Sequence, residues 1–210
     1  MYQARSDSNP PPRRGRPREF SAEAVVSSAK LVFWQRGYEG STLPDLEAST
    51  GLSRSSLYQA YGSKEGLFDE ALGEYIESFI SPRLAPMERS GSGLGDIQRF
   101  FRQLGKLFRS DLTSAQRGCL WVNTLAEFSG REALVNARAG EFQQRLHRAF
   151  ANALSGVSAT TSAANATGVE SRARLLVATT FGIWLTVRVD PAEAARTCDA
   201  VVAQVVSWRM

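Results

Sequence analysis

Residues 41–68 read STLPDLEASTGLSRSSLYQAYGSKEGLF, and they are the most informative part of the sequence for the fold. Two short segments with helical spacing, residues 43–50 and 54–61, are separated by a three-residue turn, GLS, at positions 51–53. Two short helices joined by a turn that contains glycine are the arrangement of a helix-turn-helix. The alternative is an αα-hairpin within an ordinary helical bundle, and the pattern of these residues alone leaves both open.

Capping residues mark where these helices begin. Thr42 and Asp45 have the spacing of a capping box, and Ser53 is a candidate N-cap for the second segment. Upstream, apolar residues at helical spacing predict a helix that ends at Gly37. Downstream, a fourth helix is expected over residues 64–80. The sequence therefore predicts a unit of three short helices and the start of a fourth.

The second helix of the pair leaves its polar side chains pointing outward. Leu46, Leu52 and Leu57 are the apolar positions that hold the two helices together. A short helix can bring side chains to base edges in the major groove, and an arginine can contact guanine through two hydrogen bonds. The candidates for base contacts are Arg54, Ser55, Ser56 and Gln59, and the candidates for phosphate contacts are Tyr58 and Lys64.

The first nineteen residues form a basic, proline-rich arm that cannot bury apolar area. Arg14 and Arg16 lie in an Arg-Gly-Arg-Pro segment, which has the slim, cationic shape that enters a narrow minor groove. The alternative is a solvated terminus. Residues 1–64 contain nine Lys and Arg against six Asp and Glu, so positive charge gathers where the helix-turn-helix lies.

The rest of the chain predicts more helices and no strand. Helical apolar patterns cover residues 97–108, 119–128, 131–154, 170–189 and 191–207. The low-complexity stretch 156–168 is expected to be a mobile loop, and the whole chain is expected to be all-α. Residues 175–187 are apolar on all sides, which favours burial of Trp184 in a subunit interface formed by the last two helices. This run is shorter than the roughly 20 residues of a membrane-spanning helix, so no membrane partner is expected.

Few residues suit catalysis or metal binding. The chain has one histidine, His147, which is expected at the surface, and two cysteines, Cys119 and Cys198. A metal site, a disulfide framework, a Ser-His-Asp triad and an enzymatic activity are therefore not expected, and no cofactor is implied. The cysteine content favours a reducing cytoplasm. Cys198 lies on an apolar helical stripe and is expected to pack in the core.

Residues 20–68 resemble the DNA-binding domain of the TetR/AcrR family of transcriptional repressors. The resemblance rests on an ordered set of segments: 32–38 (VFWQRGY), 41–43 (STL), 45–46 (DL), 51–53 (GLS), 57–58 (LY) and 61–68 (YGSKEGLF). It implies an all-helical homodimer with N-terminal DNA-binding heads and C-terminal ligand-binding bodies. It also implies phosphate contacts from Thr42, Tyr58 and Lys64. Ala60 departs from the pattern, because many members carry a bulky His or Tyr there.

Residues 117–123 (RGCLWVN), with Glu127, are similar to a Gly-Cys-Leu…Asn segment of one subgroup of that family. Some members of the subgroup sense electrophiles or oxidants through this cysteine. A sensor cysteine must be accessible and ionised, and Arg117 together with a helix start would favour the thiolate of Cys119. The alternative is a buried cysteine that only packs.

An apolar ligand pocket is expected next to the aromatic-rich helix at residues 97–108, although core packing is the ordinary role of each such residue. The candidate ligand-binding residues are Phe101, Leu104, Phe108, Cys119, Trp121, Asn123 and Phe128.

Together these features predict three parts: a flexible basic arm (1–19), a helix-turn-helix DNA-binding domain (20–66) and a ligand-binding and dimerisation domain (67–210). The expected function is repression of transcription in a prokaryotic cytoplasm, on the chromosome, relieved by a small-molecule effector. The expected partners are a second copy of the chain and a near-palindromic double-stranded operator. The alternative is a repressor that senses redox state or electrophiles through Cys119.

Overall fold

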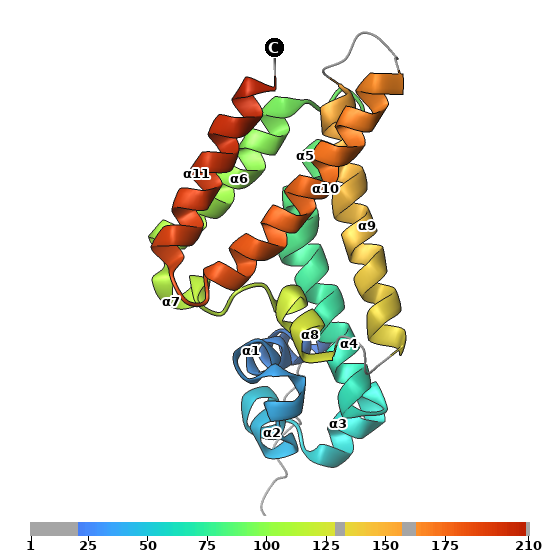
Figure 1. Cartoon of the computed structure of the whole chain (residues 1–210). Coiled ribbons are helices and arrows are strands. Elements are labelled where there is room, and N and C mark those ends of the chain that lie inside the picture. Colours follow the sequence, from blue (N-terminus) through green and yellow to red (C-terminus); the bar gives the residue numbers. More distant parts are fainter. Residues whose placement is uncertain (1–20, 129–132, 157–162, 209–210) are drawn as a thin grey trace, which may run out of the picture.

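Helices make up every regular element over the residues that the computed structural model describes, which are 21–128, 133–156 and 163–208 (Figure 1). No strand occurs within these ranges, so the expected all-α fold is confirmed. The N-terminal helices lie at one end of the molecule, and the long C-terminal helices form the other end (Figure 1).

Three short helices and the start of a fourth form the N-terminal end, as predicted. Residues 21–66 are here called the head, and the described residues from 67 onward are called the body. The helices are α1 (Ala22–Gly40), α2 (Leu43–Thr50), α3 (Arg54–Tyr61) and α4 (Lys64–Tyr75), which begins in the head and continues into the body.

Local capping chemistry sets the ends of these helices. The predicted capping box between Thr42 and Asp45 is present, and the Ser53 side chain accepts a hydrogen bond from the Ser56 amide. Glycine ends α2 at Gly51 in the left-handed conformation, with φ 72°. Gly37, the predicted end of the first helix, breaks α1 with φ 73°, but the helix resumes and ends at Gly40.

The apolar centre of the head is continuous with the core of the body. Phe33 of α1, Leu46 of α2 and Leu57 of α3 are buried, which confirms that the two short helices are held by their leucines. The Phe33 ring lies edge-on to Phe68 of α4, with 4.9 Å between ring centres. Because α4 supplies part of this core, the head is fixed to the first helix of the body.

The helix predicted over residues 64–80 continues beyond its predicted end. A single π-helical segment, η1 (Ile76–Ile80), leads directly into α5 (Ser81–Glu88), whereas the sequence suggested an end near residue 80. Pro82 lies in the first turn of α5, directly after η1, and does not end the helix.

Six further helices complete the body: α6 (Leu94–Ser110), α7 (Leu112–Ala115), α8 (Leu120–Phe128), α9 (Ala133–Ser155), α10 (Ala163–Thr186) and α11 (Pro191–Ser207). α11 packs along α6, and α10 packs along α9 (Figure 1). The stretch expected to be a loop at 156–168 is helical from Ala163 onward, and residues 157–162 lie outside the described part. Cys198 is buried against α6, as expected of a packing residue.

The predicted position of Trp184 at a subunit interface is wrong. Trp184 is 6% exposed within the single chain, and its ring contacts Phe79 and Phe108 at 5.9 Å and 5.2 Å between ring centres. The apolar run at residues 175–187 did not show which side of α10 faces the core. The outer side instead carries Leu175, 57% exposed, and Leu185, 49% exposed.

Two further expectations concern the whole chain. The expected domain boundary after residue 66 falls inside α4, and its position stays a prediction. Over the described ranges, no helix combines the length and the apolar character needed to cross a bilayer.

Candidate DNA-binding surface and body cavity

α3 presents a row of polar side chains to solvent at the end of the molecule away from the body (Figure 1). Leu57 is the buried residue of this helix. Arg54, Ser55 and Gln59 are exposed, while Ser56 and Tyr58 are half-buried. The predicted base-contacting residues therefore lie together on one accessible helix, which has the dimensions that fit a major groove.

Two cations of this surface rest on tyrosine rings. The Arg54 guanidinium lies 5.3 Å from the centre of the Tyr58 ring, and the Lys64 ammonium lies 4.3 Å from that of Tyr38. Such contacts orient a cation without neutralising it. In addition, the Glu47 carboxylate accepts a hydrogen bond from the Arg54 amide and so joins α2 to the start of α3.

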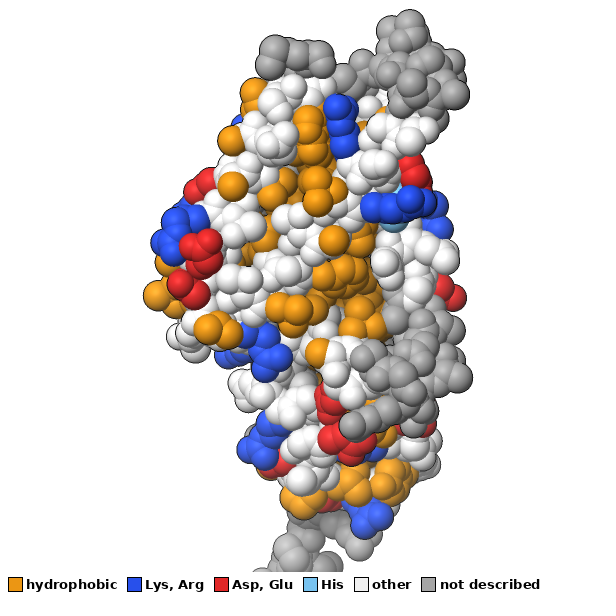
Figure 2. Space-filling model, viewed as in Figure 1, with side chains coloured by type: hydrophobic (Ala, Val, Ile, Leu, Met, Phe, Trp, Pro, Cys, Tyr) orange, Lys and Arg blue, Asp and Glu red, His pale blue; other side chains and the backbone are white. Residues whose placement is uncertain are grey.

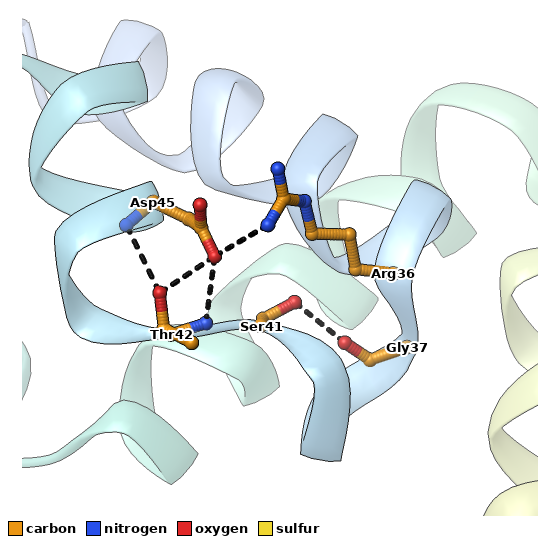
Figure 3. A network of polar contacts seen from close by, with 5 residues as sticks. All are labelled: Arg36, Gly37, Ser41, Thr42 and Asp45. Atoms are coloured by element: carbon orange, nitrogen blue, oxygen red, sulfur yellow. Dashed lines mark hydrogen bonds and ion pairs between the residues drawn. The ribbon is translucent and has the colours of Figure 1, made fainter.

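Thr42 is engaged in a local network rather than free for phosphate (Figure 3). Its hydroxyl donates to the Asp45 carboxylate at 2.6 Å, and its amide donates to the same oxygen at 3.1 Å. Arg36 Nη1 lies 2.8 Å from that oxygen. The hydrogen bonds from Thr42, followed by the charge of Arg36, hold the pKa of Asp45 below its usual value. A phosphate contact from the Thr42 hydroxyl requires that it turn away from Asp45.

α8 fastens the head to the body. The Glu127 carboxylate accepts hydrogen bonds from the amides of Tyr38 and Glu39, at 3.0 Å and 2.7 Å. These two amides follow the break at Gly37, where a side chain would meet the carboxylate, because a Cβ would lie 2.7 Å from Glu127 Oε2. At the start of α8, the Trp34 indole donates to the Gly118 carbonyl at 3.1 Å. Both ends of the α8 segment therefore contact α1.

A small apolar cavity lies inside the body, among η1, α5, α6, α8, α9 and α10. Its volume is about 30 Å³, which is room for about two water molecules. Its walls are mainly apolar, and they include Phe79, Phe100, Phe142, Phe181 and Trp184.

The predicted ligand-binding residues do not lie at one site in the structure. Leu104 and Cys119 line the cavity. Phe101 and Phe108 lie on the same helix as Leu104 but are fully buried, with Phe101 stacked on Phe150 and Phe108 packed edge-on to Trp184. The remaining three lie elsewhere: Trp121 in a groove between α4 and α9, and Asn123 and Phe128 at the contact between head and body.

The environment of Cys119 contradicts the expected ionisation of its thiol. Cys119 is 2% exposed, and burial raises the pKa of its thiol, although the Tyr75 side chain and the amides of Val122 and Trp121 at the start of α8 act in the opposite direction. Arg117 is not among the groups that shift this pKa. The helix start predicted from the sequence is present, but desolvation outweighs it.

Other residues that the sequence singled out belong neither to α3 nor to the described wall of the cavity. Arg14 and Arg16 lie outside the described residues. His147, expected at the surface, is half-buried, with Nε2 3.3 Å from the Glu170 carboxylate. The sequence pattern did not predict that Arg83 and aromatic residues of α9 and α10 line the cavity, because periodicity does not tell which side of a helix faces a cavity.

The head matches a known family. Residues 25–71, which extend from α1 into α4, match the family model described as bacterial regulatory proteins, tetR family. The chain is 37% identical over 120 residues to the HTH-type transcriptional repressor ComR of Escherichia coli (strain K12), covering 55% of each chain. It is 35% identical over 103 residues to the HTH-type transcriptional repressor BdcR of the same strain, covering 49% of this chain and 47% of BdcR. These matches span about half the length of either relative.

A solved structure resembles nearly the whole chain. A cysteine mutant of the TetR family transcriptional regulator CifR, complexed with 26-bp double-strand operator DNA, is 30% identical with a TM-score of 0.67. The likeness covers 92% of this chain and 98% of the CifR chain. The protein therefore belongs to the TetR family of bacterial regulatory proteins, a family of DNA-binding regulators and not of enzymes.

Proposed function

We propose that the protein is a sequence-specific transcriptional repressor that binds a double-stranded operator through α3 and leaves it when a small-molecule effector binds in the body. The observation that carries the proposal is the exposed polar side of α3, with Arg54, Ser55 and Gln59 accessible and Leu57 anchored in the core. The printed descriptions of ComR and BdcR as repressors, and of CifR as bound to operator DNA, favour the same function.

The DNA contacts divide by chemistry. Arg54, Ser55, Ser56 and Gln59 read base edges, while Thr42, Tyr58 and Lys64 contact phosphates. Arg14 and Arg16 of the arm over residues 1–19 enter the adjacent minor groove. If so, deletion of residues 1–18 weakens binding most where the flanks are AT-rich and leaves the melting temperature almost unchanged.

A homodimer is supported by apolar side chains on the outside of the last two helices. Leu175 and Leu185 of α10 and Val206 of α11 are exposed in the single chain. Figure 2 shows hydrophobic side chains gathered along the middle of this view of the body, over α10 and the helices beside it. A second copy on this side would remove them from water. Two heads then contact two half-sites, so the operator is a near-palindrome.

The effector is assigned to the ligand-binding domain over residues 67–210, and specifically to the cavity with Leu104 and Cys119 in its wall. In the alternative mechanism, modification of Cys119 itself releases the operator. Its position in the wall supports the alternative, but a raised thiol pKa opposes it, because the thiolate is the reactive form. The proposed location is the bacterial cytoplasm, on the chromosome.

Selection of bound sequences from a random duplex library tests the proposal. We expect a single near-palindromic motif with half-sites about one helical turn apart. When the selection is repeated with Arg54→Ala, the preference for one base should disappear at one position of each half-site. Enrichment of no motif by the unaltered protein would contradict the proposed function.

A further inference from the structure

The cavity wall contains one charged side chain, Arg83, among its described residues. Arg83 belongs to α5 and is half-buried. Its guanidinium lies 3.7 Å from the centre of the Phe79 ring, and Nη1 donates to the Phe79 carbonyl oxygen. An arginine beside an otherwise apolar hollow is unusual, because desolvation of a cation is unfavourable without an anionic partner.

No carboxylate pairs with Arg83 in the part of the chain that the structure describes. Arg145, which contacts Ser81 of α5, differs in this respect because it pairs with Glu88 at 2.7 Å. Burial lowers the pKa of Arg83. An arginine nevertheless stays protonated, so the wall presents a lasting positive charge.

A buried tyrosine lies near Arg83. Tyr75 is 1% exposed, and its hydroxyl has no hydrogen bond of ordinary geometry, although the Cys119 thiol and the Leu120 amide lie close to it. Arg83 and Cys119 line the cavity, whereas Tyr75 is not among the residues of its wall.

The backbone between Tyr75 and Arg83 is irregular. Tyr75 ends α4, and the π-helical segment η1 separates it from Arg83 in α5. A π-helical turn shifts the faces of the helix on either side of it, and such turns occur frequently at functional sites. The segment also carries Phe79 and Ile80 of the cavity wall.

We propose that the effector is a small apolar carboxylate, whose anionic end pairs with Arg83. Its apolar part lies against Phe100, Leu104 and Phe142. The assignment rests on the proposed function and names the chemical class of its effector. Since the cavity holds only about 30 Å³, binding displaces the half-buried rings of Phe142 and Phe181.

Calorimetric titration of the full chain without DNA tests this directly. The probes are propanoate, benzoate and octanoate, each paired with its neutral amide. We expect at least one carboxylate to bind about tenfold or more tightly than its amide, which is the effect of a hydrogen bond to a charged group. Arg83→Met should abolish that preference, Arg83→Lys should keep part of it, and Arg99→Met, an exposed arginine of α6, should leave it unchanged.

Equal affinity for acid and amide, undiminished preference in Arg83→Met, or no binding of any of the three carboxylates would overturn the inference. Circular dichroism of each variant verifies folding, and the milder Arg83→Lys exchange keeps the test decisive if Arg83→Met unfolds. Operator binding of the same proteins without ligand is measured separately. Failure to bind operator with intact carboxylate binding contradicts the proposed function and leaves the ligand class standing.

Discussion

Arg54 and Lys64 are both basic and both belong to the head, but they differ in what surrounds them. Arg54 is exposed at the first position of α3, whereas Lys64 is half-buried at the start of α4 over the Tyr38 ring. An exposed arginine at the start of a recognition helix suits a base edge. A lysine at a helix start, beside free amides, suits a phosphate.

The two substitutions should therefore have different signatures. Arg54→Ala should cost about 1–3 kcal/mol of operator binding and relax specificity at one base pair. Lys64→Ala should weaken binding to all sequences alike and reduce the salt slope by about one. The affinity of each variant for the operator and for operators with single-base changes, measured over a range of salt concentrations, separates these results. Identical effects from both substitutions would contradict the assigned roles.

Cys198 provides a test of burial through pH. Burial raises the pKa of its thiol to about 12, so on alkalinisation the unfolded chain loses this proton before the folded chain does. Stability is fully present below the ordinary thiol pKa of about 8.5 and falls above it, by up to about 1.4 kcal/mol per pH unit. In urea unfolding between about pH 8.5 and 10.5, Cys198→Ala should show a shallower decline than the unaltered protein. Parallel curves would mean that the thiol is hydrated in the folded state.

At the scale of elements, α8 is the connection between cavity and head. Cys119, directly before α8, lines the cavity, and Glu127 near its other end holds the amides of Tyr38 and Glu39. A shift of α8 caused by a ligand would therefore reach α1 through a short, rigid path. Glu127 is a positioning residue, because it holds the amides of α1 and does not itself contact DNA.

Loss of the Glu127 carboxylate should loosen the head. Glu127→Ala removes two charge-assisted hydrogen bonds and should lower the free energy of unfolding by about 1–2 kcal/mol, the low end for partly hydrated groups. Hydrogen exchange of the Tyr38 and Glu39 amides should accelerate at the same time. Glu141→Ala, which alters an exposed glutamate of α9, is the matched control. Unchanged exchange at both amides would argue against the connection.

Features that depend on a few neighbouring residues could be predicted from the sequence, whereas features that depend on how helices pack could not. The capping box at Thr42, the N-cap at Ser53 and the break at Gly37 were predictable because the chemistry of each lies within a few residues. An apolar pocket beside residues 97–108 was expected, but the full set of residues that line the cavity was not predictable, because it depends on how six elements cross. The stripe on α6 divides between the cavity and other packing surfaces, and η1 shifts Arg83 out of any regular helical spacing.

At the scale of the whole molecule, two copies of the chain are needed to place two heads on one duplex. Since Trp184 is internal, the interface is better probed on the outer side of α10. Leu185→Arg should turn a dimer into a folded monomer and abolish operator binding, because one head makes too few contacts. Leu31→Arg, at a leucine of α1 with 43% exposure, is the matched control for oligomeric state. Sedimentation of both variants measures their oligomeric state. If Leu185→Arg is still a dimer, the interface lies elsewhere.

The central claim is that the protein recognises a DNA sequence and not merely DNA. The most direct measurement is the affinity of the full chain for its selected operator and for a shuffled duplex of equal length and composition, at the same near-physiological salt. We expect the operator to bind at least about 10³-fold more tightly than the shuffled duplex. Equal affinities for the two duplexes would contradict the central claim.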